Sequence, residues 1–159
     1  MVPTIVCGVD GSRNATIALG AAARLADQLH ARLVVAHVVQ AGAVDAMRSA
    51  ALGRNVEAEL AAGERLLDGV FDGEEGLEAE RQVVLGFPAD QLADLADAED
   101  AELIVVGSRG RGALRAAFLG SVSTDLIGVA RCPVLVVPPG AVVSSATGHE
   151  PALAGRERR

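Results

Sequence analysis

The chain has 159 residues, a length typical of one domain, and its 50% apolar and 22% charged residues exclude a fully disordered chain. Its net charge of −7 disfavours nucleic acid or an anionic membrane surface as a partner. All 14 basic residues are arginines and no Trp or Tyr occurs, which disfavours lysine-dependent phosphate loops, Schiff-base enzymes and stacking platforms for single-stranded nucleic acid.

Short apolar runs alternate with helical patterns along the chain. The expected strands are, in order, Thr4–Val9, Leu33–Val39, Arg81–Leu85, Leu103–Val106 and Val134–Val137. The expected helices are Asn14–His30, Glu57–Val70, Pro88–Ala98 and Val122–Ala130. Most of these strands are continuously apolar, as in parallel strands that are covered on both faces. The alternation therefore predicts an open, mostly parallel α/β sheet.

The two ends of the chain differ in character. Near the amino terminus no basic region precedes the short apolar run that ends at Asp10, so we expect neither a signal peptide nor a membrane span, but a soluble cytoplasmic protein. Residues 1–139 are expected to form one domain and residues 140–159 a disordered tail.

Cys7 and Cys132 lie in apolar runs without a neighbouring His, which indicates two buried structural thiols rather than a metal site.

The most informative stretch joins the fourth strand to the last helix. It reads Val106-Gly107-Ser108-Arg109-Gly110-Arg111-Gly112, and after a short gap Leu119-Gly120-Ser121-Val122. Glycines permit a close backbone approach, and the first turn of a helix offers unpaired N–H groups to an anion. No acidic residue occurs between Glu102 and Asp125, although three arginines do. Taken alone, these residues leave two interpretations open, a flexible connection or an anion site.

The spacing Gly107-x2-Gly110-x9-Gly120-Ser121 is similar to the phosphate loop of the ATP-binding class of universal stress proteins. The segments 6–12, 33–38, 86–88 and 132–137 resemble the same family, so the resemblance covers about residues 3–138. It implies a single-domain, doubly wound parallel sheet of five strands in the order 3-2-1-4-5. It also implies an adenine nucleotide that lies across the ends of strands 1, 2 and 4, where the strand order reverses.

The resemblance also implies roles for particular residues. Asp10 and the backbone of Val38 would hold the adenine and ribose. The phosphates of ATP, with or without Mg²⁺, would be held by Gly107, Gly110, Gly120, Ser121 and Val122. Arg109 is a further candidate for the terminal phosphate, although it could, like Arg111, be a solvated loop charge. Asp10 and Gly107 are expected just past the carboxyl ends of strands 1 and 4.

Other notable side chains have simpler interpretations. His37 is expected to be a core histidine with a hydrogen-bond partner, Ser12 a helix cap and Phe118 a packing residue.

No catalytic residue is assigned, because the glycine-rich loop contains no Lys, His or second carboxylate to activate water. At most slow ATP hydrolysis is expected. The resemblance thus implies an adenine-nucleotide-binding protein of stress response or signalling. The alternatives are a nucleotide hydrolase or adenylyl-transfer enzyme of the related α-hydrolase group, a cyclic-nucleotide binder, and a dimerisation module without ligand.

The last strand carries an expectation about assembly. In a 3-2-1-4-5 sheet, Val134–Val137 is an edge strand without a charged residue, and Pro133 and Pro138 bound it. Pairing with a second copy across a two-fold axis would close this edge. Many members of the family that the sequence resembles dimerise through this strand, so a homodimer is expected.

Overall fold

The computed structural model describes residues 2–40, 56–72, 76–110 and 119–142. Its elements are, in chain order, β1 (Thr4–Gly8), α1 (Arg13–Leu29), β2 (Arg32–Gln40), α3 (Val56–Phe71), β3 (Glu80–Gly86), α4 (Pro88–Ala98), β4 (Leu103–Gly107), α5 (Ser121–Val129) and β5 (Val134–Val137). Each expected helix and strand is present, and the ends differ from the prediction by at most one residue. Most of the tail predicted at residues 140–159 lies outside the described residues.

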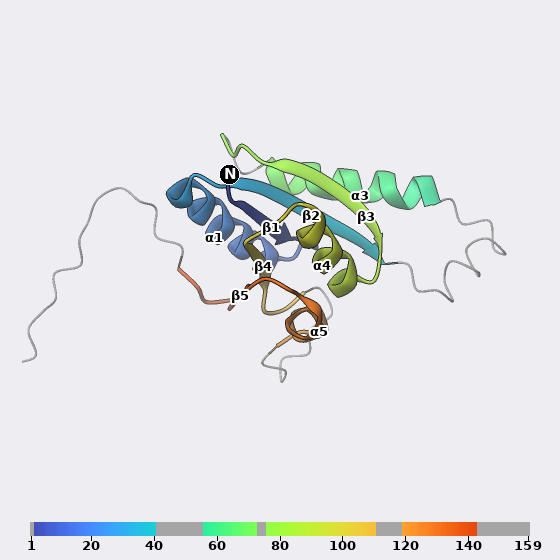
Figure 1. Ribbon diagram of the computed structural model, residues 1–159. Helices are drawn as coiled ribbons and strands as arrows, with labels where there is room; N and C mark the ends of the chain where they lie inside the picture. Colours follow the sequence, from blue (N-terminus) through green and yellow to red (C-terminus); the bar gives the residue numbers. More distant parts are fainter. Residues whose placement is uncertain (1, 41–55, 73–75, 111–118, 143–159) are drawn as a thin grey trace, which may run out of the picture.

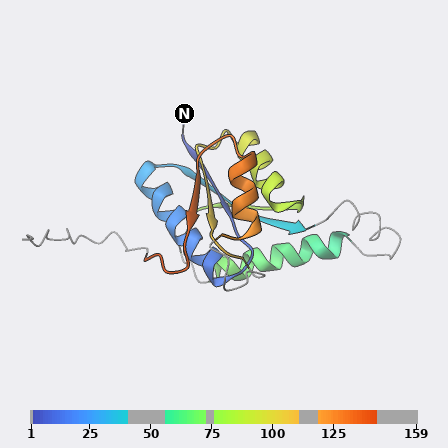
Figure 2. The same ribbon diagram turned by 90° about the horizontal axis from the view of Figure 1, so that it is seen from below.

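The five strands form one parallel sheet in the order β3-β2-β1-β4-β5, which confirms the predicted topology (Figure 1). Helices α1 and α3 cover one face of the sheet, and α4 and α5 cover the other (Figure 2). The central strands β1 and β4 are therefore buried on both sides; Val6 and Val105, for example, are wholly inaccessible. This explains why their sequences are apolar without alternation.

Helix α1 shows how local chemistry sets the element ends. The hydroxyl of Ser12 accepts a hydrogen bond from the Ala15 N–H (3.2 Å), which confirms Ser12 as the cap. At the other end His30 adopts a left-handed conformation (φ 51°) and closes the helix, whereas the sequence placed it inside. Similarly, α5 begins at Ser121 rather than Val122, with Gly120 as its N-cap.

The two cysteines differ in their surroundings. Cys7 lies in the centre of β1 and is buried, and this burial raises the pKa of its thiol to about 12. Cys132 is only partly buried, because it precedes the short edge strand β5, so the prediction of two buried thiols was wrong for Cys132. The Cys7 thiol is accordingly protonated at neutral pH and acts as a small apolar core group.

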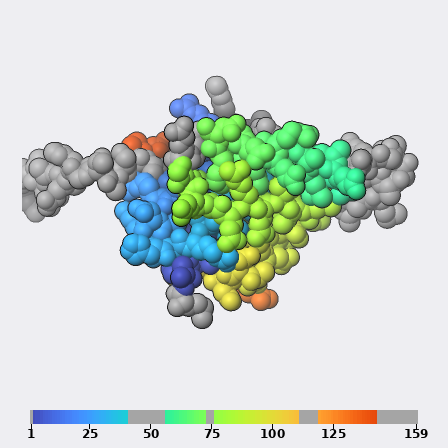
Figure 3. Space-filling model, turned by 90° about the horizontal axis from the view of Figure 1, so that it is seen from above, coloured from blue at the N-terminus to red at the C-terminus, as the bar shows by residue number. Residues whose placement is uncertain are grey.

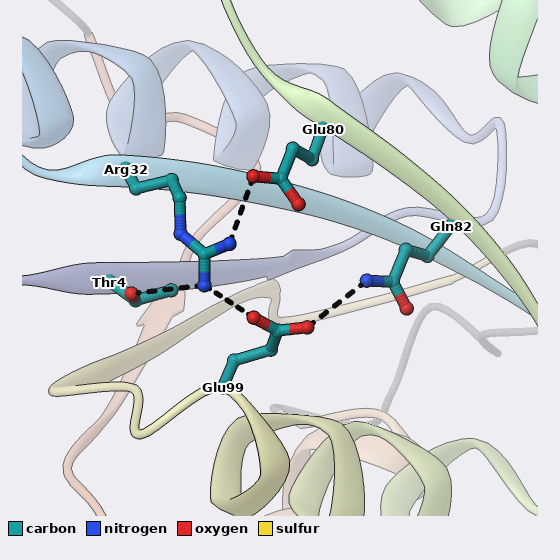
Figure 4. A network of polar contacts seen from close by, with 5 residues as sticks. All are labelled: Thr4, Arg32, Glu80, Gln82 and Glu99. Carbon is teal, nitrogen blue, oxygen red and sulfur yellow. Dashed lines mark hydrogen bonds and ion pairs between the residues drawn. The ribbon is translucent and has the colours of Figure 1, made fainter.

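A polar network joins the amino-terminal ends of three strands to the end of α4 (Figure 4). The Arg32 guanidinium donates to Glu80 (2.9 Å) and to Glu99, and it lies 3.5 Å from the Thr4 hydroxyl. The Gln82 amide donates to the other oxygen of Glu99 (3.3 Å). The network therefore ties β1, β2 and β3 together at the end of the sheet opposite the cleft described below.

Candidate functional site

A cleft of about 690 Å³ opens where the parallel strands end, within the size range of small-molecule sites. Its floor is formed by the carboxyl ends of β1, β2 and β4, and its walls by α3, α4, the start of α5 and the loop after β4. All eight sequence-predicted site residues line it: Asp10, Val38, Gly107, Arg109, Gly110, Gly120, Ser121 and Val122. Three further residues named in the sequence analysis lie outside the described residues: Arg111, Gly112 and Phe118.

Asp10 and Gly110 come from different loops and lie in close contact. The Asp10 carboxylate accepts a hydrogen bond from the Ser12 N–H (3.0 Å), which fixes the turn into α1, with Gly11 at a positive φ of 75°. A Cβ atom added at Gly110 would lie 2.5 Å from the other carboxylate oxygen of Asp10. Glycine at position 110 therefore lets the two loops meet without displacing the Asp10 carboxylate.

The end of β1 is fastened to β2 and leaves the next part of β2 uncovered. The Val9 N–H donates to the Ala36 carbonyl (2.9 Å), and the Val9 carbonyl lies 2.8 Å from His37 Nδ1. His37 therefore has a hydrogen-bond partner, as expected. It is half-buried and lines the cleft, however, and is not a core residue. In a parallel sheet, residues two apart direct their N–H and C=O toward the same neighbour. The backbone of Val38 therefore faces the space that β1 leaves after Val9, and this space is the cleft.

The loop after β4 brings the start of α5 to the cleft. The Gly120 N–H donates to the Ser108 carbonyl (2.6 Å), which closes the loop at its base. The first intrahelical bonds then run from Thr124 to the Gly120 carbonyl (3.1 Å), so the N–H groups of Ser121 and Val122 have no acceptor among the described residues. These orphan donors lie at the positive end of the helix dipole and line the cleft, which suits an anion.

The structure places two loop residues more closely than the sequence could. Gly107 is the last residue of β4 and not the first residue after it, and a Cβ there would lie 2.8 Å from the Asn14 amide nitrogen. Arg109 is half-buried along the cleft, and its Nε has no hydrogen-bond partner among the described residues. Arg109 is thus a partly enclosed cation at the cleft and not a fully solvated charge.

Sequence reasoning missed one wall of the cleft. Helix α3 contributes Glu59, Ala62, Gly63 and Leu66. A Cβ at Gly63 would lie 2.7 Å from Val83 and 3.0 Å from Val39, so this glycine lets α3 approach the sheet closely. A glycine inside a helix costs about 1 kcal/mol relative to Ala, but α3 also contains Gly69, which has nothing within 4 Å, so the sequence alone could not show which glycine marks the wall.

Among the described residues, the structure contains no group of three or more His, Cys, Asp or Glu side chains that could hold a metal ion. Nor does the described part of the chain contain a helix of the length and apolarity needed to cross a bilayer. What the cleft offers is backbone hydrogen-bonding groups at β2, a carboxylate at Asp10 and N–H donors at the start of α5.

Fold and cleft together define a class of protein: a doubly wound α/β domain with its candidate site at the topological switch point between β1 and β4. The sequence model of the universal stress protein family matches residues 1–138. A universal stress protein of Thermus aquaticus is 37% identical over 141 residues, covering 86% of this chain and 99% of the relative. The chain belongs to the universal stress protein family.

Longer relatives and solved structures agree with this assignment. A universal stress protein of Mycobacterium tuberculosis is 30% identical over 95% of this chain, and the chain spans about half (53%) of that relative's length. The crystal structure of a universal stress protein in complex with cAMP superposes with a TM-score of 0.65 at 26% identity, covering 85% of this chain and 96% of the other. The universal stress protein of Archaeoglobus fulgidus in complex with dAMP gives 0.53 at 26% identity, covering 86% and 98%.

Proposed function

We propose that this chain is an ATP-binding universal stress protein that holds the nucleotide in the cleft and changes its interactions according to the ligand state. One observation carries the proposal. A single cleft presents the uncovered backbone of Val38 at one end and the orphan N–H groups of Ser121 and Val122 at the other. The first is suited to the hydrogen-bonding edge of a base and the second to phosphates.

For the base and sugar, we assign Asp10 and the Val38 backbone. An N–H and a C=O that point the same way from one strand can pair with an adjacent acceptor and donor of a base, as adenine presents them. The ligands named for two structural neighbours, cAMP and dAMP, are both adenine nucleotides, which supports adenine as the base. A cyclic nucleotide would use the same base contacts and is an outcome that the experiment below can return.

For the phosphates, we assign the glycine-rich loop and the start of α5: Gly107, Arg109, Gly110, Gly120, Ser121 and Val122. Arg109 would add a cation to the backbone donors. Mg²⁺, where it accompanies the nucleotide, would be held chiefly by the phosphates and by water.

The proposal extends to the whole chain. Residues 1–139 would form the nucleotide-binding domain and 140–159 a separate tail, in the cytoplasm, with a role in stress response or signalling as the family name suggests. The domain would act as a homodimer joined through β5. Catalysis is not part of the proposed role.

The decisive experiment is mass spectrometry of the small molecules that the purified protein releases on denaturation, followed by calorimetry with ATP, cAMP and GTP. We expect an adenine nucleotide in the released fraction and a preference for ATP over GTP. Release of no nucleotide, with no heat of binding for any of the three, would refute the proposal. Turnover of ATP above about 1 s⁻¹, the lower end of ordinary enzyme rates, would favour the hydrolase instead.

A further inference from the structure

A buried amide lies directly behind the loop that we assign to the phosphates. Asn14 sits in the first turn of α1 and is only 8% exposed. Its side-chain Nδ2 donates to the Arg109 carbonyl (3.2 Å) and lies 3.5 Å from both the Ser108 hydroxyl and the Val137 carbonyl. Gly107 makes room for this side chain, as noted above. Asn14 thereby touches the end of β4, the loop and the end of β5 at once.

The orientation of this amide follows from its neighbours. The carbonyls of Arg109 and Val137 can only accept hydrogen bonds, so the NH₂ group of Asn14 must face them, and the flipped amide would place oxygen against oxygen. The opposite atom, Oδ1, is buried and has no partner among the described residues. An unpaired buried carbonyl is destabilising, so an Asn at this position requires a compensating role for its donor.

That role follows from the geometry of the peptide group between Arg109 and Gly110. A trans peptide points its C=O and N–H in opposite directions, and the described residues contain no cis peptide bond. Because Asn14 holds the Arg109 carbonyl, the Gly110 N–H points away from Asn14. Gly110 lines the cleft whereas Asn14 does not, and no described residue accepts from the Gly110 N–H.

The neighbouring peptides of the loop are held by other groups. The Ser108 N–H donates to the Val137 carbonyl (2.8 Å), and the Ser108 carbonyl accepts from Gly120 (2.6 Å) and lies 3.5 Å from the Ser123 hydroxyl. Within the described part of the loop, the Arg109–Gly110 peptide is thus the one whose orientation depends on the Asn14 side chain.

We infer that Asn14 is a positioning residue: its amide fixes the Arg109–Gly110 peptide so that the Gly110 N–H faces the cleft as a preorganised donor to a phosphate. This inference rests on the proposed function and names a residue that does not touch the ligand. A donor that is already oriented binds an anion without the cost of reorganising the loop. Loss of the Asn14 donor should therefore weaken phosphate binding and leave the base contacts unchanged.

The test compares Asn14→Ala with Ser12→Ala, a control that removes another polar contact of the first turn of α1 without touching the loop. Calorimetry with ATP and with adenosine, which lacks phosphates, gives the ratio of the two affinities. For Asn14→Ala we expect ATP affinity to fall about tenfold and adenosine affinity to change less than about twofold. For Ser12→Ala we expect both affinities to stay within about twofold of the wild type.

The outcomes separate this inference from the proposed function. A wild type that binds neither ATP nor adenosine overturns the function, whereas equal ATP affinity in wild type and Asn14→Ala overturns only the role of Asn14. If Asn14→Ala does not fold, as judged by circular dichroism, Asn14→Ser replaces it, with a smaller loss expected from its shorter donor. Residual dipolar couplings of the Gly110 N–H in the ligand-free wild type add a direct test, and a vector that points away from the cleft overturns the inference without any variant.

Discussion

At the residue scale, the glycines of the loop leave room for neighbouring side chains, in addition to any contact with a ligand. A side chain at Gly110 would collide with the Asp10 carboxylate, and one at Gly107 would collide with Asn14. A loss of nucleotide affinity in Gly110→Asp would therefore not distinguish a lost phosphate contact from a displaced Asp10. A cleaner probe is a residue that lines the cleft without being packed, and Ser121 is exposed at the first position of α5.

We expect Ser121→Asp to weaken ATP binding at least tenfold and to stabilise the ligand-free protein slightly. A carboxylate in the first helical turn interacts favourably with the helix dipole, by about 0.3–1 kcal/mol, but repels a phosphate bound at the same place. Calorimetry with ATP and urea denaturation without ligand measure the two effects. Because the expected changes have opposite signs, general damage to the fold cannot imitate them.

The matched control is Ser121→Asn, which has nearly the same shape as Ser121→Asp and no charge. We expect its ATP affinity to stay within about threefold of the wild type. Equal affinities for the Asp and Asn variants would show that no phosphate approaches the start of α5, and the assigned site would then be wrong.

At the scale of elements, the close approach of α3 to the sheet depends on Gly63. We expect Gly63→Ala to destabilise the fold relative to Gly69→Ala by about 1–3 kcal/mol. Both changes gain about 0.5–1 kcal/mol of helix propensity, but only at Gly63 does the new methyl group meet Val83 at 2.7 Å; nothing lies within 4 Å at Gly69. The midpoints of urea denaturation measure the difference. Equal stability of the two variants would mean that α3 does not need the close approach.

The network around Arg32 should make stability depend on pH in the acid range. The hydrogen bond from Arg32 holds the pKa of the Glu99 carboxyl below its ordinary value of 4.5. A lowered pKa in the folded state stabilises the fold above about pH 4.5, and this contribution is lost as the pH falls through the lowered value. We therefore expect Arg32→Gln to lower the urea midpoint at pH 7 and to differ less from the wild type at pH 3.

The control for this effect is Arg131→Gln, which removes a solvent-exposed pair with Asp97 (3.2 Å; the Arg131 side chain is 84% exposed). Exposed pairs contribute little, so we expect this variant to follow the wild type across the pH range. A difference between Arg32→Gln and the wild type that stays constant from pH 7 to pH 3 would contradict the role assigned to Glu99.

The sequence predicted some elements of the fold and of the cleft and missed others. Continuous apolar runs located β1 and β4, because burial on both faces of the sheet leaves a strong local signal, whereas β3 lies at an edge and has a more polar sequence. The same signal cannot report contacts between distant segments. Three features depend on how the helices dock onto the sheet. They are the wall formed by α3, the support that Asn14 gives to Arg109, 95 positions away, and the ion pair of Arg32 with Glu99, the residue that caps the end of α4. The spacing of the loop glycines nevertheless located the cleft residues, since the ends of β1 and β4 adjoin in any 3-2-1-4-5 sheet.

At the scale of the whole molecule, the sheet has two unlike edges. Strand β3 is long and lies beside α3 on the side shown in Figure 3, whereas β5 has four residues and carries no charge. The Pro133 carbonyl accepts from Ile104 of β4, and the Val137 carbonyl accepts from Ser108, the residue after β4. Residues 133, 135 and 137 therefore direct their backbone N–H and C=O groups toward β4. The N–H and C=O groups of Val134 and Val136 therefore point out of the sheet, in the arrangement that a second strand could pair with.

We expect the protein to be a homodimer through β5 and Leu135→Lys to make it monomeric. Leu135 is 37% exposed, so a Lys there can reach solvent in the monomer, whereas Val136 packs against the α4–α5 core and its replacement would disturb the fold. Two copies related by a two-fold axis would bring the new charges together across the pair, where they repel. Sedimentation at micromolar concentration should show a wild-type dimer, a Leu135→Lys monomer that still binds ATP, and an unchanged dimer for Leu29→Lys, which alters an equally apolar, exposed site on α1. A monomeric wild type, or a Leu135→Lys protein that remains dimeric, would show that β5 is not the contact.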